Sequence, residues 1–340
     1  MKLKKRVLGL AAGLAACIAF LWLAWPSVYL RLAQPYVLCD MGTQALGEGR
    51  AEDARRYFQT AMDRDPTWAE SYAGMANLSL AAWDMEGAIS GYQTAIRCAA
   101  ADPDRVDDGF IRGCYMQIAD LYAAMGRLED GQAVLVHGYE ATGDPDLLDH
   151  TLFENRLSLS GACLTDLTPL ASGNWDHLES LLISYGYGIS DYSPITSLPN
   201  LKELRLADCG LTDLSFLEGS DGFSRMIFVE NDITDLTALR GMDNLRELNL
   251  GYNLNLSALD GLETLSGLEQ LYIGYTSVTD LEPLRGCQSL RRLELTYLDI
   301  DDYSPIRDCP IEMLDVHRLP REDVDLLCKM FPDATFYAST

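Results

Sequence analysis

The sequence predicts an α+β repeat protein in which an α-helical solenoid is followed by an α/β solenoid built on parallel strands. Three observations predict this fold class: an apolar frame that returns about every 22 residues from residue 178 onward, an alanine-rich helical pattern with a period of about 34 residues upstream of it, and an apolar segment near the N-terminus. A fixed period in this range is the signature of a solenoid, in which each repeat stacks on the next.

The C-terminal frame has the form L-x-x-L-x-L, with other apolar residues in place of some leucines. Its copies begin at Leu178, Leu201, Phe223, Leu245, Leu268, Leu290 and Ile311. The L-x-L half alternates, so its leucines point to one side of a short strand. One such turn cannot bury that face alone, and we expect neighbouring turns to stack into a continuous core. An earlier, degenerate turn is predicted near Leu157 and Leu159.

A second signature follows most of the strands. It reads Ser/Thr-Asp, often with Pro three residues after the Asp, as in residues 189–195 (ISDYSPI) and residues 278–284 (VTDLEPL). This pattern suits a turn that leads into one turn of 3₁₀ or α helix. We therefore expect short helical segments on the convex side of the solenoid.

The two signatures together resemble the short leucine-rich repeats of the internalin type, over about half of the chain. The resemblance places the repeats in residues 151–320 and a terminal cap, a helix and a final strand, in residues 321–340. It also implies an Asn three residues after the last frame leucine, which bonds backbone groups between turns. That position holds Gly186, Cys209, Asn231, Asn253, Thr276 and Leu298. The resemblance thus implies an interrupted asparagine ladder and local irregularity of the solenoid.

Residues 35–145 carry the helical pattern. The first unit has Gly49, Ala54, Phe58, Ala61 and Pro66 in a 34-residue frame, the second has Trp83, Ala88, Tyr92 and Ala95, and the third has Tyr115, Ala119, Tyr122, Gly126, Gly131 and Leu135. These residues resemble tetratricopeptide repeats, whose small side chains let paired helices approach closely. An ordinary helical bundle is the alternative. The segment 99–112 is predicted to be a longer loop between repeats.

The tetratricopeptide resemblance also bears on ligand binding. The version of that fold that captures a peptide carboxylate uses Lys and Asn on its first helices. The corresponding positions hold Cys39, Thr43, Ala73, Asn77, Met116 and Asp120, of which only Asn77 matches. We therefore do not predict capture of a C-terminal carboxylate, and packing against the following solenoid remains an equal use of this module.

The N-terminus sets the expected compartment. Residues 1–6 are basic, and residues 7–25 then contain neither charge nor proline, close to the about 20 residues that a membrane-spanning helix needs. Positive charge ahead of this segment predicts a transmembrane signal anchor at 7–25, with a cytoplasmic N-terminus, an exported body and the lipid bilayer as a partner. A cleaved signal peptide is one alternative. Another is a lipoprotein anchored at Cys17, because the run LAAC that ends there resembles the lipobox of bacterial lipoproteins.

The charge of the chain excludes one class of partner. The net charge is −25, and the part beyond residue 6 is more acidic still, because four of the 26 basic residues and none of the 51 acidic ones lie in residues 1–6. Nucleic-acid binding needs clustered Lys and Arg, so we predict no nucleic-acid partner. The acidity of the chain has two alternative interpretations. It serves solubility, or it attracts a basic partner or loosely bound divalent cations.

The nine cysteines stand singly, without a C-x-x-C pair or zinc spacing. Their scatter predicts reduced, mostly buried thiols. A search for catalytic motifs finds no GxxxxGK[ST], GxGxxG after a strand, GxSxG or HExxH pattern. The many aspartates recur at one frame position of the turn signature, which indicates a capping role. The sequence therefore predicts no catalytic residue, no metal or cofactor site, and a protein that is not an enzyme.

One surface feature remains, a stripe of tyrosines. Two residues after the last frame leucine stand Tyr185, Asp208, Glu230, Tyr252, Tyr275 and Tyr297. Turns lie about 4.8 Å apart at the strands, so we expect rings in neighbouring turns to stack on the concave side. Tyr272 is expected one column over, with Arg246, Arg291 and Arg292 beside it. Tyr and Arg are enriched in binding hot spots. The predicted partner-binding residues are Tyr185, Arg246, Tyr252, Tyr272, Tyr275, Arg291 and Tyr297.

Two interpretations of the whole follow. The first is a non-catalytic, membrane-anchored extracytoplasmic scaffold or receptor that binds a protein or peptide through its repeat surfaces. The alternative is an accessory module of an envelope enzyme system, which would recognise a glycan or cell-wall polymer with the tyrosine stripe. Under either interpretation the tyrosines could instead only support neighbouring turns.

Overall fold

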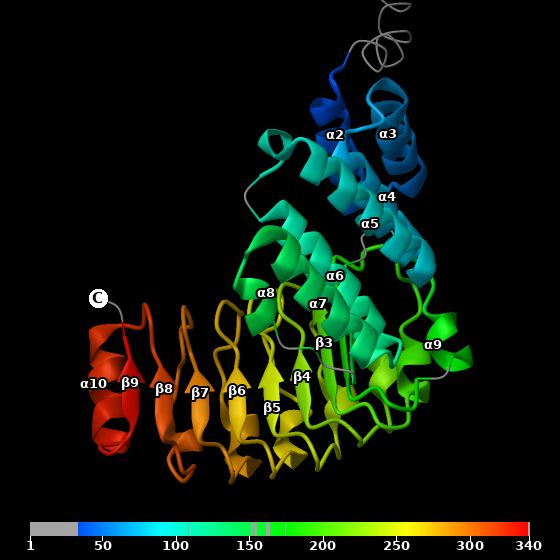
Figure 1. Ribbon diagram of the computed structural model, residues 1–340. Helices are drawn as coiled ribbons and strands as arrows, with labels where there is room; N and C mark the ends of the chain where they lie inside the picture. Colours follow the sequence, from blue (N-terminus) through cyan, green and yellow to red (C-terminus); the bar gives the residue numbers. More distant parts are fainter. Residues whose placement is uncertain are drawn as a thin grey trace, which may run out of the picture.

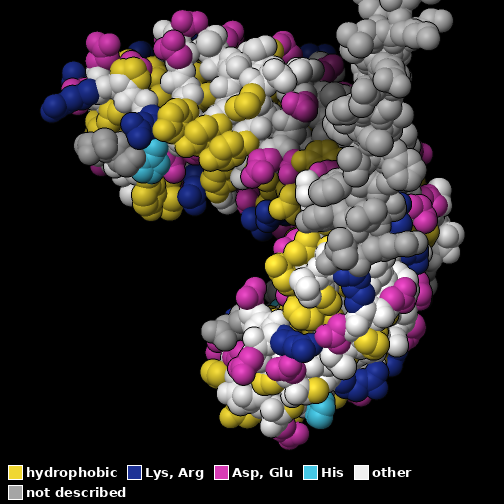
Figure 2. Space-filling view, turned by 90° about the horizontal axis from the view of Figure 1, so that it is seen from above, with side chains coloured by type: hydrophobic (Ala, Val, Ile, Leu, Met, Phe, Trp, Pro, Cys, Tyr) yellow, Lys and Arg dark blue, Asp and Glu magenta, His cyan; other side chains and the backbone are white. Residues whose placement is uncertain are grey.

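The structure is a computed structural model that describes residues 33–107, 109–150, 152, 155–160, 164–173 and 175–338. The predicted anchor at 7–25, the basic residues 1–6 and Cys17 lie outside the described residues. Two modules follow one another in Figure 1, a set of helical hairpins and a solenoid of parallel strands. Seen from above, they form two arms with an open hollow between them (Figure 2).

The helical module confirms the predicted repeats as three successive hairpins. Their helices are α2 (Pro35–Gly47), α3 (Ala51–Arg64), α4 (Ala69–Ala81), α5 (Met85–Ala101), α6 (Phe110–Ala124) and α7 (Leu128–Thr142), followed by the short α8 (Asp146–Asp149). Close packing depends on small side chains, as expected: a Cβ added at Gly74 would lie 2.3 Å from the ring of Phe58. The predicted loop at 99–112 is shorter than expected, because α5 continues to Ala101 and a 3₁₀ turn, η1 (Pro103–Arg105), fills part of the remainder.

The solenoid confirms the L-x-x-L-x-L frame. Its strands are β1 (Arg156–Ser160), β2 (Ser180–Ser184), β3 (Glu203–Ala207), β4 (Arg225–Ile227), β5 (Glu247–Asn249), β6 (Gln270–Tyr272), β7 (Arg292–Glu294), β8 (Met313–Asp315) and β9 (Thr335–Tyr337). Within the described residues they form one parallel sheet in chain order. The middle frame residue of each turn pairs with its equivalent one turn on, as Leu248 does with Leu271. The degenerate turn is also confirmed, since Leu157 pairs with Leu181.

Short helical segments return the chain along the convex side, as the second signature predicts. They are α9 (Thr168–Ser172), η2 (Ser193–Ser197), η3 (Ser215–Leu217), η4 (Thr237–Leu239), η5 (Leu262–Thr264), η6 (Glu282–Gly286) and η7 (Ser304–Ile306). The signature aspartate caps each start: Asp235 Oδ1 accepts a hydrogen bond from the Thr237 backbone N–H at 2.7 Å. This bond holds the pKa of Asp235 below its usual value. Ala258 replaces the aspartate before η5, and that segment begins two residues later in the frame.

The asparagine ladder is interrupted, as the resemblance implies. Asn253 is fully buried, and its Nδ2 donates to the Phe228 carbonyl in the previous turn and to the Leu250 carbonyl in its own, both at 2.8 Å. Cys209 makes a weaker version of the contact, with its Sγ 3.7 Å from the Ile183 carbonyl oxygen. Thr276 bonds only within its own turn. The sheet nonetheless continues in register through these positions, so strand pairing and leucine packing hold the turns together where the ladder fails.

One hydrophobic cluster spans the junction of the two modules, beside two smaller clusters that lie within the helices. Leu80, Ile118 and Leu121 of the helices belong to the same buried cluster as the frame leucines. Polar contacts fix the junction: the Trp83 indole N–H donates to the Asp166 carbonyl at 2.8 Å, and His177 Nε2 lies 3.0 Å from the Ala124 carbonyl oxygen. The helical module therefore closes the N-terminal end of the leucine core.

A helix and a strand close the other end of the core, as predicted. Helix α10 (Arg321–Met330) buries Leu327, and Phe331 follows it into the core. Strand β9 then pairs with β8. Both ends of the stacked leucines are thus shielded from water, which a solenoid needs for solubility.

Cysteines in the described part of the chain are free thiols. Cys39, Cys114, Cys209, Cys287 and Cys309 are buried, whereas Cys98 is half-buried and Cys328 exposed. Burial raises the pKa of Cys287 to about 12 and that of Cys309 to about 11. The prediction of mostly buried thiols is confirmed, since five of these seven cysteines are buried. Among the described residues, no helix combines the length and apolar character needed to cross a bilayer.

The stacked core predicts a large difference between two leucines of the same turn. Leu248→Asp would place an unpaired carboxylate in a site with no solvent exposure, which costs several kcal/mol. Leu254→Asp makes the same chemical change at a side chain that is 64% exposed. Urea unfolding should show a strongly lowered midpoint for Leu248→Asp and a nearly unchanged one for Leu254→Asp. Equal midpoints for the two variants would contradict the assigned frame.

Candidate partner-binding surface

The residue two positions after the last frame leucine has an unusual backbone conformation in the turns from β2 to β8. Its φ is positive, between 53° and 66°, at Tyr185, Asp208, Glu230, Tyr252, Tyr275, Tyr297 and Arg318. L-residues other than Gly, Asn and Asp rarely adopt this left-handed conformation. We call these seven residues the rim column, because they lie just beyond the carboxyl ends of the strands, at the edge of the concave sheet.

Hydrogen bonds between turns hold the rim column in place. The backbone N–H of Tyr252 donates to the Gly274 carbonyl at 3.0 Å, and that of Tyr275 donates to the Thr296 carbonyl at 2.9 Å. Equivalent bonds start from Tyr185, Asp208, Glu230 and Tyr297. Each bond continues the ladder of the sheet beyond the end of the strand, by one residue after β2 and β3 and by three residues after β4 to β7. The side chains of the rim column therefore project from a backbone that is fixed on both sides.

Three rim tyrosines form a stacked ladder, as the sequence predicts. The ring centroids of Tyr252 and Tyr275 are 4.2 Å apart with an angle of 9° between the planes, and those of Tyr275 and Tyr297 are 4.5 Å apart with an angle of 31°. Tyr252 and Tyr297 are each 48% exposed. The ring faces between them are filled by neighbouring rings, so the ladder presents ring edges and hydroxyl groups to solvent.

The ladder lies in an exposed apolar patch. Leu254, two residues after Tyr252, is 64% exposed and adds an aliphatic side chain to the same loop. Figure 2 shows a band of hydrophobic side chains on this edge of the solenoid, facing the viewer beside the hollow. Desolvation between the flanking rings, reinforced by the Tyr252 and Tyr297 hydroxyls, raises the pKa of Tyr275 to about 12. Tyr275 is therefore neutral at physiological pH.

The rest of the rim column surrounds the ladder with charged and aromatic groups. On the C-terminal side the guanidinium of Arg318 lies 5.8 Å from the ring centroid of Tyr297, a contact that the sequence frame did not reveal. On the N-terminal side come Glu230 and then Asp208, which accepts a hydrogen bond from the Tyr187 hydroxyl. Tyr185 is 50% exposed and has no aromatic neighbour among the described residues.

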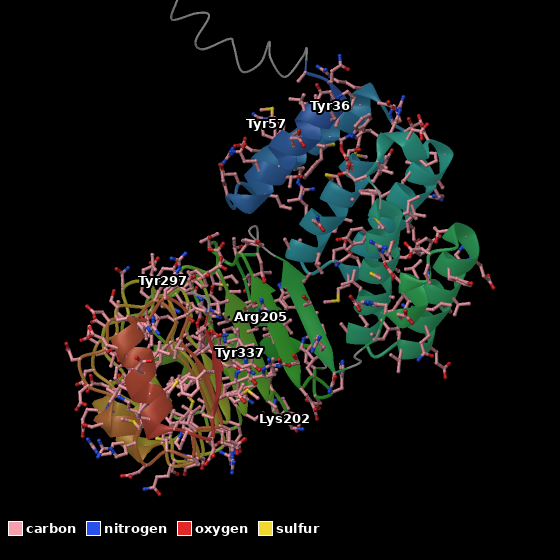
Figure 3. The ribbon with its side chains drawn as sticks, turned by 90° about the vertical axis from the view of Figure 1, so that its left-hand side faces the viewer. Tyr36, Tyr57, Lys202, Arg205, Tyr297 and Tyr337 are labelled. Atoms are coloured by element: carbon pink, nitrogen blue, oxygen red, sulfur yellow. The ribbon has the colours of Figure 1, made fainter. Side chains whose placement is uncertain are left out.

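The arginines lie elsewhere than expected. Arg246 and Arg291 stand at the amino ends of their strands, where Arg246 lies 3.8 Å from Glu269 and Arg291 pairs with Glu312. Lys202 occupies the equivalent frame position, and Figure 3 shows Lys202 and Tyr297 at opposite edges of the solenoid, with Arg205 and Tyr337 on the sheet between them. The structure therefore does not bring Arg246 and Arg291 to the tyrosine ladder.

Tyr272 belongs to the concave face rather than to the rim. It lies in the middle column of the sheet, paired with Asn249 and Glu294. The guanidinium of Arg292 stands 5.2 Å from its ring centroid, which confirms the expected neighbour. The Tyr272 hydroxyl donates to Gln270 Oε1 at 2.9 Å. Tyr272 thus forms a small cluster with Gln270 and Arg292, which pair with each other in neighbouring strands.

The inner side chains of the helical module are engaged within the protein. The Tyr92 hydroxyl donates to Asn77, and His150 Nε2 lies 2.8 Å from Asp120 Oδ1. Burial raises the pKa of Asp120, and His150 opposes that rise. Asp120 and His150 line a cavity of about 420 Å³ between α6 and the first strands, together with Arg156. Asn77 and Asp120 are therefore part of the packing of the module and its junction.

The described residues hold no group of three or more His, Cys, Asp or Glu side chains arranged to bind a metal.

Comparisons with known proteins find similar structures but no family. No protein-family profile matches the chain, and no curated protein matches its sequence. Among solved structures, 54% of the chain is similar to an internalin from Listeria monocytogenes, with 24% identity and a TM-score of 0.44, covering 56% of that chain. A leucine-rich repeat protein from Leptospira interrogans matches 51% of the chain, with 17% identity and a TM-score of 0.40, covering 51% of that chain.

A further similarity, over 34% of the chain, is to the N-terminal domain of stress-induced protein-1 from C. elegans, with 16% identity and a TM-score of 0.30, covering 89% of that chain. The chain spans just over half the length of the internalin and of the Leptospira protein.

The contribution of ring stacking can be measured with two variants of one frame position. Tyr275→Asn removes a ring with two stacked neighbours, and Tyr185→Asn removes one with none, while Asn tolerates the positive φ at both sites. Aromatic pairs contribute about 0.5–1.5 kcal/mol each. Urea unfolding should therefore show Tyr275→Asn to be less stable than Tyr185→Asn by about 1–3 kcal/mol. Indistinguishable stabilities would mean that the rings do not stack in solution.

Proposed function

We propose that this protein is a non-catalytic, membrane-anchored extracytoplasmic scaffold or receptor that binds a protein or peptide through its repeat surfaces. The observation that carries the proposal is the ladder of Tyr252, Tyr275 and Tyr297, which is ordered by stacking yet half exposed to solvent. Tyrosine is one of the residue types that dominate binding energy at protein interfaces.

The ladder is preorganised for binding. Its backbone is fixed by hydrogen bonds between turns, and its rings restrict one another by stacking. Ordering a flexible side chain at an interface costs about 0.5–1.5 kcal/mol, and a rigid aromatic residue avoids much of this cost. A partner that meets the ladder would therefore gain buried apolar area with little loss of side-chain freedom.

The geometry favours a peptide over a glycan as the ligand. A sugar ring packs its C–H groups against an aromatic face, and both faces of Tyr275 are covered by Tyr252 and Tyr297. The guanidinium of Arg318 lies over Tyr297 at the end of the ladder. Ring edges, hydroxyl groups and the aliphatic Leu254 suit the mixed polar and apolar surface of a polypeptide. The glycan-binding alternative consequently has less support from the structure.

The non-catalytic part of the proposal rests on how the carboxylates are used. Asp166, Asp191, Asp213, Asp235, Asp280 and Asp302 each accept a backbone N–H at the start of a convex segment. Their recurrence at one frame position has a structural cause, because each one caps the turn that follows its strand. These residues therefore give no support to acid/base chemistry.

Membrane anchoring and export are proposed from the sequence alone. The basic residues 1–6 and the apolar residues 7–25 support a signal anchor with its N-terminus in the cytoplasm. Protease added to intact cells should degrade the repeat modules and leave an N-terminal epitope tag intact, whereas lysed cells should lose both. Full protection of the repeat modules in intact cells would reject this orientation. Lipid labelling that depends on Cys17 would show that the lipoprotein alternative is correct.

The binding role can be tested once a partner is captured by crosslinking in native membranes and identified by mass spectrometry. Tyr275→Asn should weaken binding of that partner by about 1–3 kcal/mol, roughly tenfold or more. Asn is preferred to Ala because φ is 57° at this position. Asp260→Ala, on the convex side, is the control and should bind like wild type.

The triple variant Tyr252→Asn, Tyr275→Asn, Tyr297→Asn separates binding from stability. If this variant is folded by circular dichroism and binds the partner with wild-type affinity, the ladder has a structural role only. The proposal would then be wrong for this surface.

A further inference from the structure

The two long edges of the concave sheet carry charge in different ways. At the amino ends of the strands, carboxylates are matched by cations across turns, as in the pairs Lys202–Glu179, Arg246–Glu269 and Arg291–Glu312. At the carboxyl ends, Asp208 and Glu230 stand in adjacent turns of the rim column, and Asp232 follows two residues after Glu230. Among the described residues, no Lys, Arg or His lies within ion-pair distance of these three carboxylates.

This arrangement is unfavourable for the isolated protein. Like charges in neighbouring turns repel one another, and the solenoid as a whole already has a large excess of acidic residues. The first edge shows that this fold readily places a cation beside a carboxylate one turn away. Asp208 and Asp232 accept hydrogen bonds from the Tyr187 hydroxyl and from Asn255 Nδ2, but the negative charge of this edge has no cation beside it among the described residues.

The unmatched carboxylates adjoin the tyrosine ladder directly. Glu230 is exposed and immediately precedes Tyr252 in the rim column, and Leu254 lies one loop position outside that tyrosine. The same surface thus has an anionic end and an apolar aromatic end. Both ends face away from the convex side, and Tyr252 and Tyr297 at the two ends of the ladder are each 48% exposed.

We propose that the rim binds an extended segment of a protein partner that carries Lys or Arg side chains beside a short apolar stretch. The cations would meet Asp208, Glu230 and Asp232, and the apolar side chains would pack on Tyr252, Tyr275, Tyr297 and Leu254. This inference rests on the proposed function and specifies the chemistry of the partner. The carboxylates of the rim favour basic residues in the partner segment through charge complementarity. The exposed ring edges favour an apolar stretch beside them.

The spacing of the turns sets the length of the segment. From Asp208 to Tyr297 the rim column takes four steps of about 4.8 Å, or about 19 Å in all. An extended chain advances about 3.3 Å per residue, so about six residues span the surface. The expected motif has two basic residues at one end and apolar residues over the remaining four, in either chain direction.

The charged and aromatic halves should affect different rate constants. Exposed carboxylates steer the encounter, so removing one mainly slows association and reduces the dependence on salt. The ladder holds the bound segment, so removing a ring mainly speeds dissociation. This difference allows the inference about charge to fail while the proposed function survives.

The test uses the full-length chain and random twelve-residue peptides displayed on phage, selected at low salt and counter-selected against Tyr275→Asn. We expect the enriched peptides to combine adjacent basic residues with an apolar stretch. The best peptide, synthesised with a fluorescent label, is then measured by stopped-flow anisotropy. Glu230→Gln should weaken its binding about two- to fivefold, and Glu230→Lys about tenfold, through slower association. Asp260→Asn makes the same change of charge on the convex side and should leave both rate constants unchanged.

Three results would overturn the inference. Enriched peptides that depend on Tyr275 but lack Lys and Arg would reject the basic half and leave the proposed function standing. Association rate constants that are the same for wild type, Glu230→Lys and Asp260→Asn would also reject the role of the basic residues and leave the proposed function standing. If no enriched peptide depends on Tyr275, both the inference and the proposed role of the ladder are wrong.

Discussion

The proposed binding surface depends on the hydrogen bonds that the rim residues from Tyr185 to Tyr297 donate to carbonyls of the next turn. These bonds extend the parallel sheet beyond the strands, at residues such as Tyr252 and Tyr275 whose backbone is left-handed. A residue held in this conformation costs about 1–3 kcal/mol and persists only where its surroundings determine it. Here the surroundings are the neighbouring turns, since each one fixes the next. Stacking of the tyrosines offsets part of that cost and orders the surface at the same time.

The two modules depend on each other through the hydrophobic cluster that spans their junction. The leucine columns end against α4 and α6 on one side and against α10 on the other. A solenoid turn is stable only when both of its faces are covered, so the helical repeats act as the N-terminal cap of the leucine solenoid. This role accounts for the engagement of Asn77 and Asp120 in internal contacts. The rim tyrosines Tyr252 and Tyr297, in contrast, remain half exposed. We therefore place the proposed recognition surface at this edge of the sheet rather than on the inner side of the helices.

The sequence predicted the features that repeat and missed those that depend on closing each turn. The frame leucines, the capping aspartates and the alignment of Tyr252, Tyr275 and Tyr297 follow from a constant period, and the structure confirms them. The positive φ at the rim tyrosines has no local signal, because tyrosine does not favour that conformation; it recurs also at Asp208 and Glu230, where no ring is stacked, so the packing of successive turns imposes it.

The misplaced arginines have a simpler cause. Arg246 precedes Tyr252 by six residues along an extended strand, which separates their backbones by about 20 Å. Counting along the frame would have placed the two residues on opposite edges of the sheet. Arg318 was missed because the turn that holds it lacks the tyrosine of its neighbours, although it occupies the same frame position.

Amide hydrogen exchange tests most directly whether the rim is a rigid extension of the sheet. The side chains of Tyr252 and Tyr297 are half exposed, yet their backbone N–H groups donate to carbonyls of the next turn. Because protection follows the free energy of opening, these amides should exchange as slowly as that of Leu250, whose N–H donates to Tyr272 within the core of the sheet. Exchange of the rim amides orders of magnitude faster than that of Leu250 would contradict the account, since the tyrosines would then stand on a mobile loop.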